Sequence, residues 1–442
     1  MVKKIVLVNP STPEYAMKLF PPLSLASLAA FIPDDYEVKI IDNNFQRLDY
    51  DADLAAITAN TYSIRRAYLI ANQFRERGIP VVLGGNHPSI LPEESMRYAD
   101  SVVVGDGELV WQNLLQDLEE GKLRKVYKSG LFDFSKFKIP RRDLIKNEYK
   151  FESFETVRGC PLDCYFCSVT RFHGRTYRYK PLNYLKKEVE SLKKKNVFIV
   201  DDNIIGVGGK AVGRAVELFG LLKEYSLHWM GQASINIADD ERILKLLAES
   251  GCMFLFIGFE SIDPNILSSF NKKLNLSKGV SNYKNIVKKI HDYGVGVMGS
   301  FIIGTDFDTK DSLNRLKDFI IESDIDIPNI THLTPYPGTK IYDKLVSENR
   351  LFNNQFWLED PFPLFTFKPK NLTIQELYDI SLEITEQLNS MIPVIFRFLK
   401  SIIGKRSFRR SVFSMAESLI TGRTFKNNLK KWKIKTALIS ES

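Results

Sequence analysis

The chain is poor in the two residue types that build most metal sites and disulfide frameworks. Its 442 residues include only 4 cysteines and 5 histidines. Because three of the cysteines are clustered, they do not form a disulfide scaffold, and a reducing, cytoplasmic setting is expected. The histidines are scattered without metal-ligand spacing, so we expect structural roles for most of them, His173 having the best chance of a substrate role.

Long hydrophobic runs are also absent. The first residues carry only a short apolar run before polar side chains, which predicts a first strand rather than a secretion signal. The longest uncharged apolar-rich stretch, Tyr293 to Thr305, is too short for a bilayer, which takes about 20 residues. An apolar share of 44% and a charged share of 26% are typical of a globular protein with two or three domains.

The net positive charge of the chain lies in its C-terminal tail. From Met391 onward twelve Lys and Arg face only Glu417 and Glu441, so the net charge of +8 leaves the preceding residues at −2. The tail includes 394–410, where Phe and Ile alternate with Arg and Lys. This basic amphipathic stretch suits an anionic membrane surface, or packing on the protein body with solvated charges outside. No RNA-reading module is recognisable, so a nucleic-acid partner is not expected.

Cys160, Cys164 and Cys167 follow a Cys-x3-Cys-x2-Cys spacing and are the most informative residues of the chain. Three thiolates in one tight loop suit an iron–sulfur cluster with one iron left open. Zinc is the alternative, but structural zinc usually takes four closed ligands. Cys252 is the only other cysteine, and its apolar strand predicts a buried small side chain.

The first third of the chain alternates β-branched runs with helical segments. Such a pattern predicts a doubly wound parallel sheet, which binds ligands at the carboxyl ends of its strands. The expected strands are Ile5–Asn9, Val38–Asp42, Leu54–Thr58, Val81–Gly85 and Ser101–Gly105. The residues that follow these strands are either simple turns or a ligand site. They include Ser11, Thr12, Thr58, Asn60, Gly84, Gly85, His87, Gly105, Gly107 and Glu108.

A second alternating pattern begins near Phe151 and fits an open, partial (β/α)6 barrel with its chemistry at the strand ends. The expected strands are Phe154–Val157, Val197–Val200, His228–Ala233, Met253–Phe259, Val295–Ile303 and Ile330–Pro335. The cysteine loop directly follows the first of them. Polar residues end later strands: Asp202, Gln232, Ser234 and Glu260. Each is either a ligand contact or a helix cap.

The cysteine run, with Phe166 before the last cysteine and the strand Phe154–Val157 before the first, resembles the radical S-adenosylmethionine (SAM) superfamily. The resemblance implies a 4Fe-4S cluster on Cys160, Cys164 and Cys167, whose open iron chelates SAM. Electron transfer would then cleave SAM to a 5′-deoxyadenosyl radical. The resemblance also implies SAM contacts, for Phe166, Asp202, Gln232, Ser234, Glu260 and Gly304.

Three N-terminal segments resemble the cobalamin-binding domain that precedes many radical SAM barrels. They are 21–30, 84–93 and 104–108. The resemblance implies cobalamin at the strand-end residues named above. The chain departs from one cobalamin pattern, since it contains no Asp-x-His-x-x-Gly. A histidine ligand to cobalt is therefore missing, and the loop position of His87 suits contacts with the wall or tail of the cofactor.

These patterns predict an α/β chain with four parts: residues 1–135 as the cobalamin-binding-like domain, 136–150 as a linker, 151–345 as the barrel, and 346–442 as a helical, basic C-terminal region. The implied activity is cobalamin-dependent C-methylation of a small-molecule or lipid-like substrate. It needs a reducing donor, flavodoxin- or ferredoxin-like. Radical cyclisation, oxidation or sulfur insertion is the alternative within the superfamily. A non-catalytic zinc or RNA-associated protein is the alternative outside it.

Overall fold

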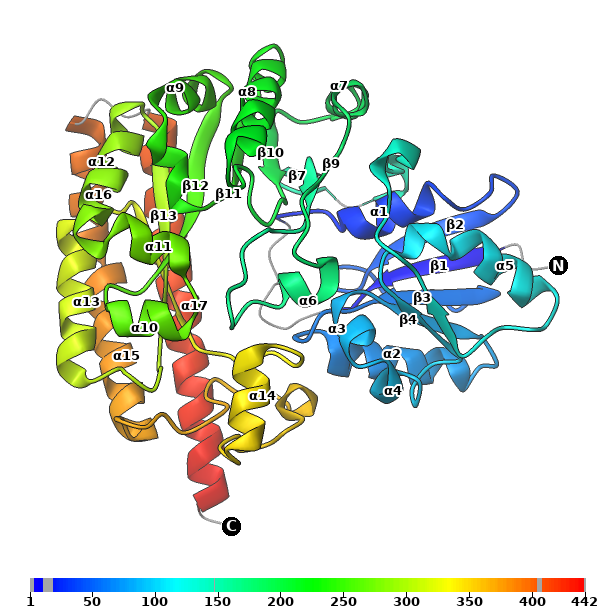
Figure 1. Ribbon diagram of the computed structural model, residues 1–442. Coiled ribbons are helices and arrows are strands. Elements are labelled where there is room, and N and C mark those ends of the chain that lie inside the picture. The colour runs from blue at the N-terminus through cyan, green and yellow to red at the C-terminus, as the bar shows by residue number, and fades with distance from the viewer. Residues whose placement is uncertain (1–3, 11–18, 147, 404–407, 441–442) are drawn as a thin grey trace.

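Two parallel sheets, each of six strands, organise the described part of the chain (Figure 1). The computed structural model describes residues 4–10, 19–146, 148–403 and 408–440. The N-terminal sheet and its helices form one domain, and the second sheet and its helices form another beside it. The C-terminal helices pack along the second sheet.

The N-terminal sheet has the order β2-β1-β3-β4-β5-β6, with every pairing parallel. Helices α1 (Leu23–Ala29) and α5 (Trp111–Glu119) bury apolar side chains on one face, and α2 (Ile64–Arg75) covers the other. The doubly wound prediction is therefore confirmed. The strands are β1 (Lys4–Asn9), β2 (Glu37–Asp42), β3 (Leu54–Thr58), β4 (Val81–Gly84), β5 (Ser101–Val104) and β6 (Val126–Lys128). Sequence missed only β6, which is three residues long and has a single buried side chain.

The second sheet has the order β14-β13-β12-β11-β10-β7 and is also wholly parallel, which confirms the partial barrel. Its strands are β7 (Glu152–Phe154), β10 (Asn196–Ile199), β11 (His228–Ala233), β12 (Cys252–Glu260), β13 (Gly296–Ile303) and β14 (Ile327–His332). Crossover helices lie between them. They are α7 (Leu182–Glu190), α8 (Gly209–Lys223), α9 (Glu241–Glu249), α12 (Tyr283–Asp292) and α13 (Lys310–Glu322). Their apolar stripes pack on the strands in one continuous core.

Two predicted barrel strands are placed wrongly. The first does not run through 154–157, because β7 ends at Phe154 and Val157 starts a separate ribbon, β8 (Val157–Arg158) with β9 (Arg178–Tyr179). The last covers Ile327–His332 rather than 330–335. Its Pro328 reads as a strand breaker in sequence but is tolerated because β14 is an edge strand.

The C-terminal region is helical, as predicted. It contains α14 (Lys340–Ser347), α15 (Ile374–Asn389), α16 (Met391–Ile403) and α17 (Phe408–Ser440). Helix α17 packs against β14, α15 and α16. Ser414 donates to the carbonyl of Asp326 (3.0 Å), and Arg410 donates to that of Cys252 (3.0 Å). None of the described helices is long and apolar enough to cross a membrane.

Candidate functional site

The three clustered cysteines lie in one cavity at the carboxyl end of the barrel strands. Cys160, Cys164 and Cys167 are half-buried on the loop between β8 and α6 (Val169–His173). They line a cavity of about 340 Å³, here called the thiol cavity. Five of the six residues expected at SAM also line it: Phe166, Asp202, Gln232, Ser234 and Glu260. Residues from five different segments therefore converge on one chamber.

The thiols of this cavity are hard to deprotonate, because they are withdrawn from water. Burial raises the pKa of Cys160, raises that of Cys164 to about 11 and raises that of Cys167 to about 12. A buried thiolate becomes favourable only beside compensating positive charge, which cluster irons supply. Within the described residues, no three His, Cys, Asp or Glu side chains are placed to hold a single metal ion. The donor set suits a multi-iron cluster, where each thiolate takes its own iron, better than a closed zinc site.

The three residues of the run Asp201-Asp202-Asn203, which follows β10, make different contacts. Asp201 is buried and accepts hydrogen bonds from the backbone amides of Thr156 (2.7 Å) and Val157 (3.1 Å), which fixes the approach to the cysteine loop. Asp202 instead lines the thiol cavity, where burial, followed by the nearby Glu155 carboxylate, raises its pKa to about 6. Asn203 donates to the Ser234 hydroxyl (3.0 Å) and so links two strand ends.

Glu260 and Lys272 form a buried ion pair at the wall of the thiol cavity, 3.0 Å apart. Glu260 has a φ of 65°, a backbone conformation that non-glycine residues rarely adopt and that clusters at functional sites. A Cβ on Gly258 would collide with the Glu260 carboxylate, so the glycine leaves the space that the Glu260 side chain occupies. Burial alone would lower the pKa of Lys272, but Glu260 and then Cys164 hold it above its ordinary value. Sequence reasoning missed Lys272, because it lies twelve residues from its partner.

Gly304 is the one expected SAM residue that does not line the thiol cavity. Its φ is +81°, and a Cβ there would lie 2.9 Å from Leu377 of α15. The position is therefore a tight strand-to-helix contact.

Two tyrosines that the sequence did not single out for SAM also line the thiol cavity. They are Tyr62 and Tyr336, with ring centroids 5.8 Å apart. Tyr62 comes from the N-terminal domain, so this domain supplies part of the wall.

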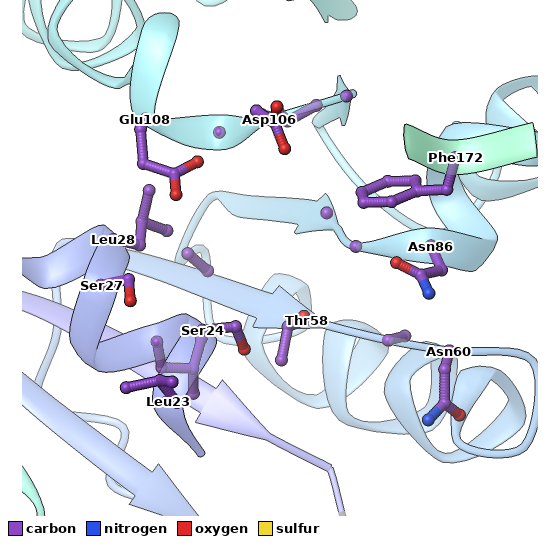
Figure 2. A pocket seen from close by; sticks show the side chains of 18 of the residues that line it. Leu23, Ser24, Ser27, Leu28, Thr58, Asn60, Asn86, Asp106, Glu108 and Phe172 are labelled. Carbon is purple, nitrogen blue, oxygen red and sulfur yellow. The ribbon is translucent and has the colours of Figure 1, made fainter. Parts of the chain in front are cut away.

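A second cavity, of about 400 Å³, lies at the carboxyl ends of the N-terminal strands and is here called the strand-end cavity (Figure 2). Seven of the ten residues expected at cobalamin line it: Thr58, Asn60, Gly84, Gly85, Gly105, Gly107 and Glu108. Helix α1 contributes Leu23, Ser24 and Leu28, and Phe172 projects into it from α6 of the barrel domain. The cavity is thus bounded by both domains.

Glycine backbone forms the floor of this cavity at two places. Gly85 has a φ of +99°, and a Cβ there would lie 2.7 Å from the Ala59 carbonyl oxygen. Gly105 has a φ of +94°, and a Cβ would lie 2.6 Å from the Ser129 hydroxyl. Only glycine combines this conformation with such close approach. The result is a smooth glycine floor at the strand ends, which suits a large rigid macrocycle, in a cavity whose lining also includes the paired charges of Asp106, Glu108, Glu155 and Arg158.

Of the other three expected cobalamin residues, only His87 is among those that the structure describes. His87 is fully buried away from the cavity lining, where it pairs with Glu94 (3.2 Å) and Thr61 (3.3 Å) and lies edge-on to Trp357. Both ring nitrogens are engaged, so the histidine ties α3 (Asn86–Ile90) to neighbouring loops. Ser11 and Thr12 lie outside the described residues.

An ion network joins the two domains beside the strand-end cavity. Arg158 of β8 contacts Asp106 (2.9 Å) and Glu108 (3.1 Å) of the N-terminal domain, and Arg178 contacts Asp106 (2.6 Å). Burial alone would raise the pKa of Asp106, but the two arginines hold it below its ordinary value. Nothing in the sequence pairs these residues, which lie 50 positions or more apart.

Helix α6 forms the partition between the two chambers. Its Val169 and Thr170 face the thiol cavity, and its Phe172 and His173 line the strand-end cavity. Burial, then Arg158, lowers the pKa of His173 to about 4, so this histidine is a neutral wall residue at ordinary pH. Groups held in the two chambers are therefore separated by a single helical turn.

Comparisons with known proteins agree with this arrangement. The sequence model of the radical SAM superfamily matches residues 154–320, and that of the B12 binding domain matches residues 16–115. The chain is 30% identical to bacteriochlorophyllide d C-8(2)-methyltransferase from Chlorobaculum tepidum, covering 76% of this chain and 78% of that protein. It is 29% identical to hopanoid C-2 methylase from Rhodopseudomonas palustris, covering 76% and 66%.

Solved structures show the same fold. The radical SAM methyltransferase TsrM from Kitasatospora setae, solved with cobalamin and a [4Fe-4S] cluster, superposes with a TM-score of 0.71 at 17% identity, covering 97% of this chain and all of that one. The cobalamin-dependent enzyme OxsB superposes with a TM-score of 0.70 at 15% identity, covering 96% and 72%.

The cofactors of the chain are thus a 4Fe-4S cluster, SAM and cobalamin, and the two chambers fit them by their chemistry. Three buried thiols with a cation nearby suit the cluster, and the glycine cradle suits the macrocycle. The chain belongs to the radical SAM superfamily, in the branch whose barrel follows an N-terminal B12-binding domain.

Proposed function

We propose that this enzyme transfers a methyl group to an unactivated carbon of a small-molecule substrate. Its relatives include methyltransferases that act on bacteriochlorophyllide d and on hopanoids. The observation that carries the proposal is the meeting of the thiol cavity and the strand-end cavity at α6. When bound, the cofactors supply the electron and the radical that activate the substrate and the methyl group that it receives. Methyl transfer needs both chambers close together, whereas radical cyclisation or oxidation needs only the first.

In this proposal the residues of the thiol cavity hold and orient SAM. Cys160, Cys164 and Cys167 ligate the cluster. Asp202 accepts from the methionyl amino group, because a carboxylate at a strand end is suited to an ammonium. Glu260, held in place by Lys272, contacts the ribose. Gln232, Ser234 and Phe166 complete the wall.

The strand-end residues hold cobalamin by shape. Gly85 and Gly105 allow close approach, while Thr58, Asn60 and Glu108 offer hydrogen bonds to its amide side chains. The domain limits of 1–135 and 151–345 place each chamber at the edge of its own domain. Residues 136–150 then serve as the linker.

The test is anaerobic incubation of the reconstituted, cobalamin-loaded enzyme with a reductant and methyl-labelled SAM. Ring substrates of the kinds that its relatives methylate form the first panel. We expect 5′-deoxyadenosine together with label in the product. Formation of 5′-deoxyadenosine without label in a converted product supports the alternative of cyclisation, oxidation or sulfur insertion. A flavodoxin- or ferredoxin-like protein is the expected physiological donor.

We also propose that α16 rests on the inner face of the cytoplasmic membrane. Its apolar side chains are unusually exposed: Ile392 is 82% exposed, and Phe396 and Met391 are each 59% exposed. Ile395, Leu399 and Ile402 extend the same stripe, and Lys400 lies beside it. An apolar stripe flanked by basic residues binds anionic lipid surfaces. Such contact suits a lipid-like substrate.

Vesicle flotation with and without anionic lipid tests this contact. Ile392→Glu removes the most exposed apolar side chain, and we expect at least a fivefold loss of vesicle-bound protein, since burying such a side chain gives roughly 1.5 to 3 kcal/mol. Val216→Glu on α8 is the matched control, because Val216 is also an exposed aliphatic residue, at 41%. Equal binding of the two variants refutes the proposal.

A further inference from the structure

A third cavity, of about 430 Å³, opens onto the thiol cavity and is here called the ring cavity. The two share Tyr62, Thr331, His332 and Thr334. Its remaining walls come from segment 352–366 and from α17, which lie beyond the residues that match the superfamily model. Most of the ring cavity is therefore built by residues outside the two matched family models.

The walls of the ring cavity are mainly rigid and aromatic. Phe352, Phe356, Phe362, Phe365 and Phe425 line it, together with Pro361 and Pro363. Phe362 lies 4.4 Å from the ring of Tyr62. Its only charged lining residues are Glu359 and Lys431, among those that the structure describes. Uncharged polar side chains also line it, so the cavity combines aromatic faces with single polar groups, which suits a largely apolar ring system and not a polyanion. These polar side chains are Thr331, Thr334, Asn353, Thr366, Thr424 and Asn428.

His332 stands at the junction of the ring cavity and the thiol cavity. It is stacked on Phe425 (5.3 Å), meets Phe365 edge-on (4.6 Å), and its Nε2 lies 2.9 Å from the Ser381 hydroxyl. Its Nδ1 is buried and has no hydrogen-bond partner among the described residues. Burial lowers the pKa of His332 to about 3, so the ring stays neutral. An unsatisfied buried nitrogen is destabilising, and a polar substituent of a ligand can satisfy it.

We propose that the ring cavity is the substrate site, and that it takes a rigid, fused-ring, largely apolar molecule with one polar substituent directed at His332. Rigid rings lose little conformational freedom against these walls and gain stacking contacts, while a flexible acyl chain loses its rotamers. The shared wall at Tyr62 and His332 places the near edge of such a molecule beside the chamber that holds SAM. This inference rests on the proposed function only in treating the occupant as the substrate.

Pyrenecarboxylate and palmitate are suitable probes, since both are monocarboxylates of nearly equal carbon number and differ in rigidity. Binding to the cluster- and cobalamin-loaded enzyme is followed by pyrene fluorescence, with palmitate as competitor. We expect pyrenecarboxylate to bind about tenfold more tightly than palmitate. Thr424→Trp, which places an indole in the ring cavity, weakens it about tenfold, equivalent to about 1.4 kcal/mol.

Arg423→Trp is the matched control, because Arg423 is the exposed neighbour that does not line the cavity. It leaves pyrenecarboxylate binding within about twofold. Phe362→Ala removes one aromatic wall and weakens binding independently of any added bulk. SAM cleavage in the absence of substrate is unchanged in Arg423→Trp. Equal binding of the two probes, or equal effects of Thr424→Trp and Arg423→Trp, overturns the inference.

The two proposals fail in different ways. If wild-type enzyme cleaves and transfers label but does not bind pyrenecarboxylate, only the ring-cavity inference fails. If pyrenecarboxylate binds as expected and no label is transferred, the methylation proposal fails and the ring cavity remains a site for fused rings.

Discussion

The thiol cavity and the strand-end cavity lie on either side of α6 but are built from different materials. The strand-end cavity has a floor of glycine backbone and small polar side chains, and the Arg158 ion network with Asp106, Glu108 and Glu155 forms part of its wall. The thiol cavity is lined by thiols, carboxylates and a lysine, several of them with displaced pKa values. Shape holds a large rigid group, whereas charge and donor atoms hold a small reactive one. A substitution in one chamber should therefore weaken binding of the cofactor of that chamber and leave the other cofactor bound.

The largest effect is expected from Cys164→Ala. Removing one of three thiols leaves the cluster with two protein ligands, so iron content and 5′-deoxyadenosine formation fall to background. Bound corrinoid, measured by its visible absorption, stays at the wild-type level because the strand-end cavity is untouched. Cys252→Ala is the control: that thiol is fully buried in the barrel core and lines neither chamber. Loss of corrinoid together with iron would show that the chambers are not independent.

The converse experiment is Gly85→Ala. The added Cβ meets the Ala59 backbone and the Thr58 hydroxyl, so the loop that carries Thr58 and Asn60 must shift. We expect corrinoid affinity to fall about tenfold, consistent with an overpacking cost of roughly 1 to 3 kcal/mol, and iron content to stay unchanged. Gly78→Ala has a comparable φ of +74° but meets nothing within 4 Å. It therefore reports backbone strain alone, and should leave corrinoid stoichiometry intact.

Asp106→Asn tests how the chambers are held together. The change removes the carboxylate that Arg158 and Arg178 share, while Arg158 keeps Glu108 and Glu155, so the free energy of unfolding should fall by about 1 to 3 kcal/mol. The pKa of Asp106 lies below 3.8 in the folded state, so its contribution is present above that pH and is lost as pH falls through the folded value. Urea unfolding measures the change.

Glu322→Gln is the comparison for that network, because Glu322 pairs with Lys284 on the surface (2.6 Å). An exposed pair contributes less than about 1 kcal/mol. Similar losses in the two variants would mean that the Asp106 network does not stabilise the domain junction.

Sequence predicted the parts of these chambers that follow from local patterns. β3 and β11 match their expected bounds, and the cysteines and strand-end glycines line the chambers expected for them. The remaining features of the chambers depend on tertiary contacts, which the periodicity of the sequence does not predict. The Glu260–Lys272 pair forms through a loop, and the ring cavity joins an irregular segment to a distant helix. His87 was misplaced because a loop histidine after a glycine gives no sign of whether it faces outward or inward.

The smallest effect concerns His332, at the wall between the thiol cavity and the ring cavity. Its pKa of about 3 in the folded state lies below the ordinary value of 6.5. The unfolded chain therefore binds the proton more readily, and stability falls as pH drops below 6.5. Between pH 6.5 and 5.5 the loss from this one residue is about 1 kcal/mol. His332→Gln should flatten the unfolding free energy over that interval by this amount. Ser381→Ala, which removes the hydrogen-bond partner but keeps the imidazole, should lower stability at every pH and retain the slope. If the slope is unchanged in His332→Gln, the ring is not held neutral by burial, and the wall between the two chambers carries charge.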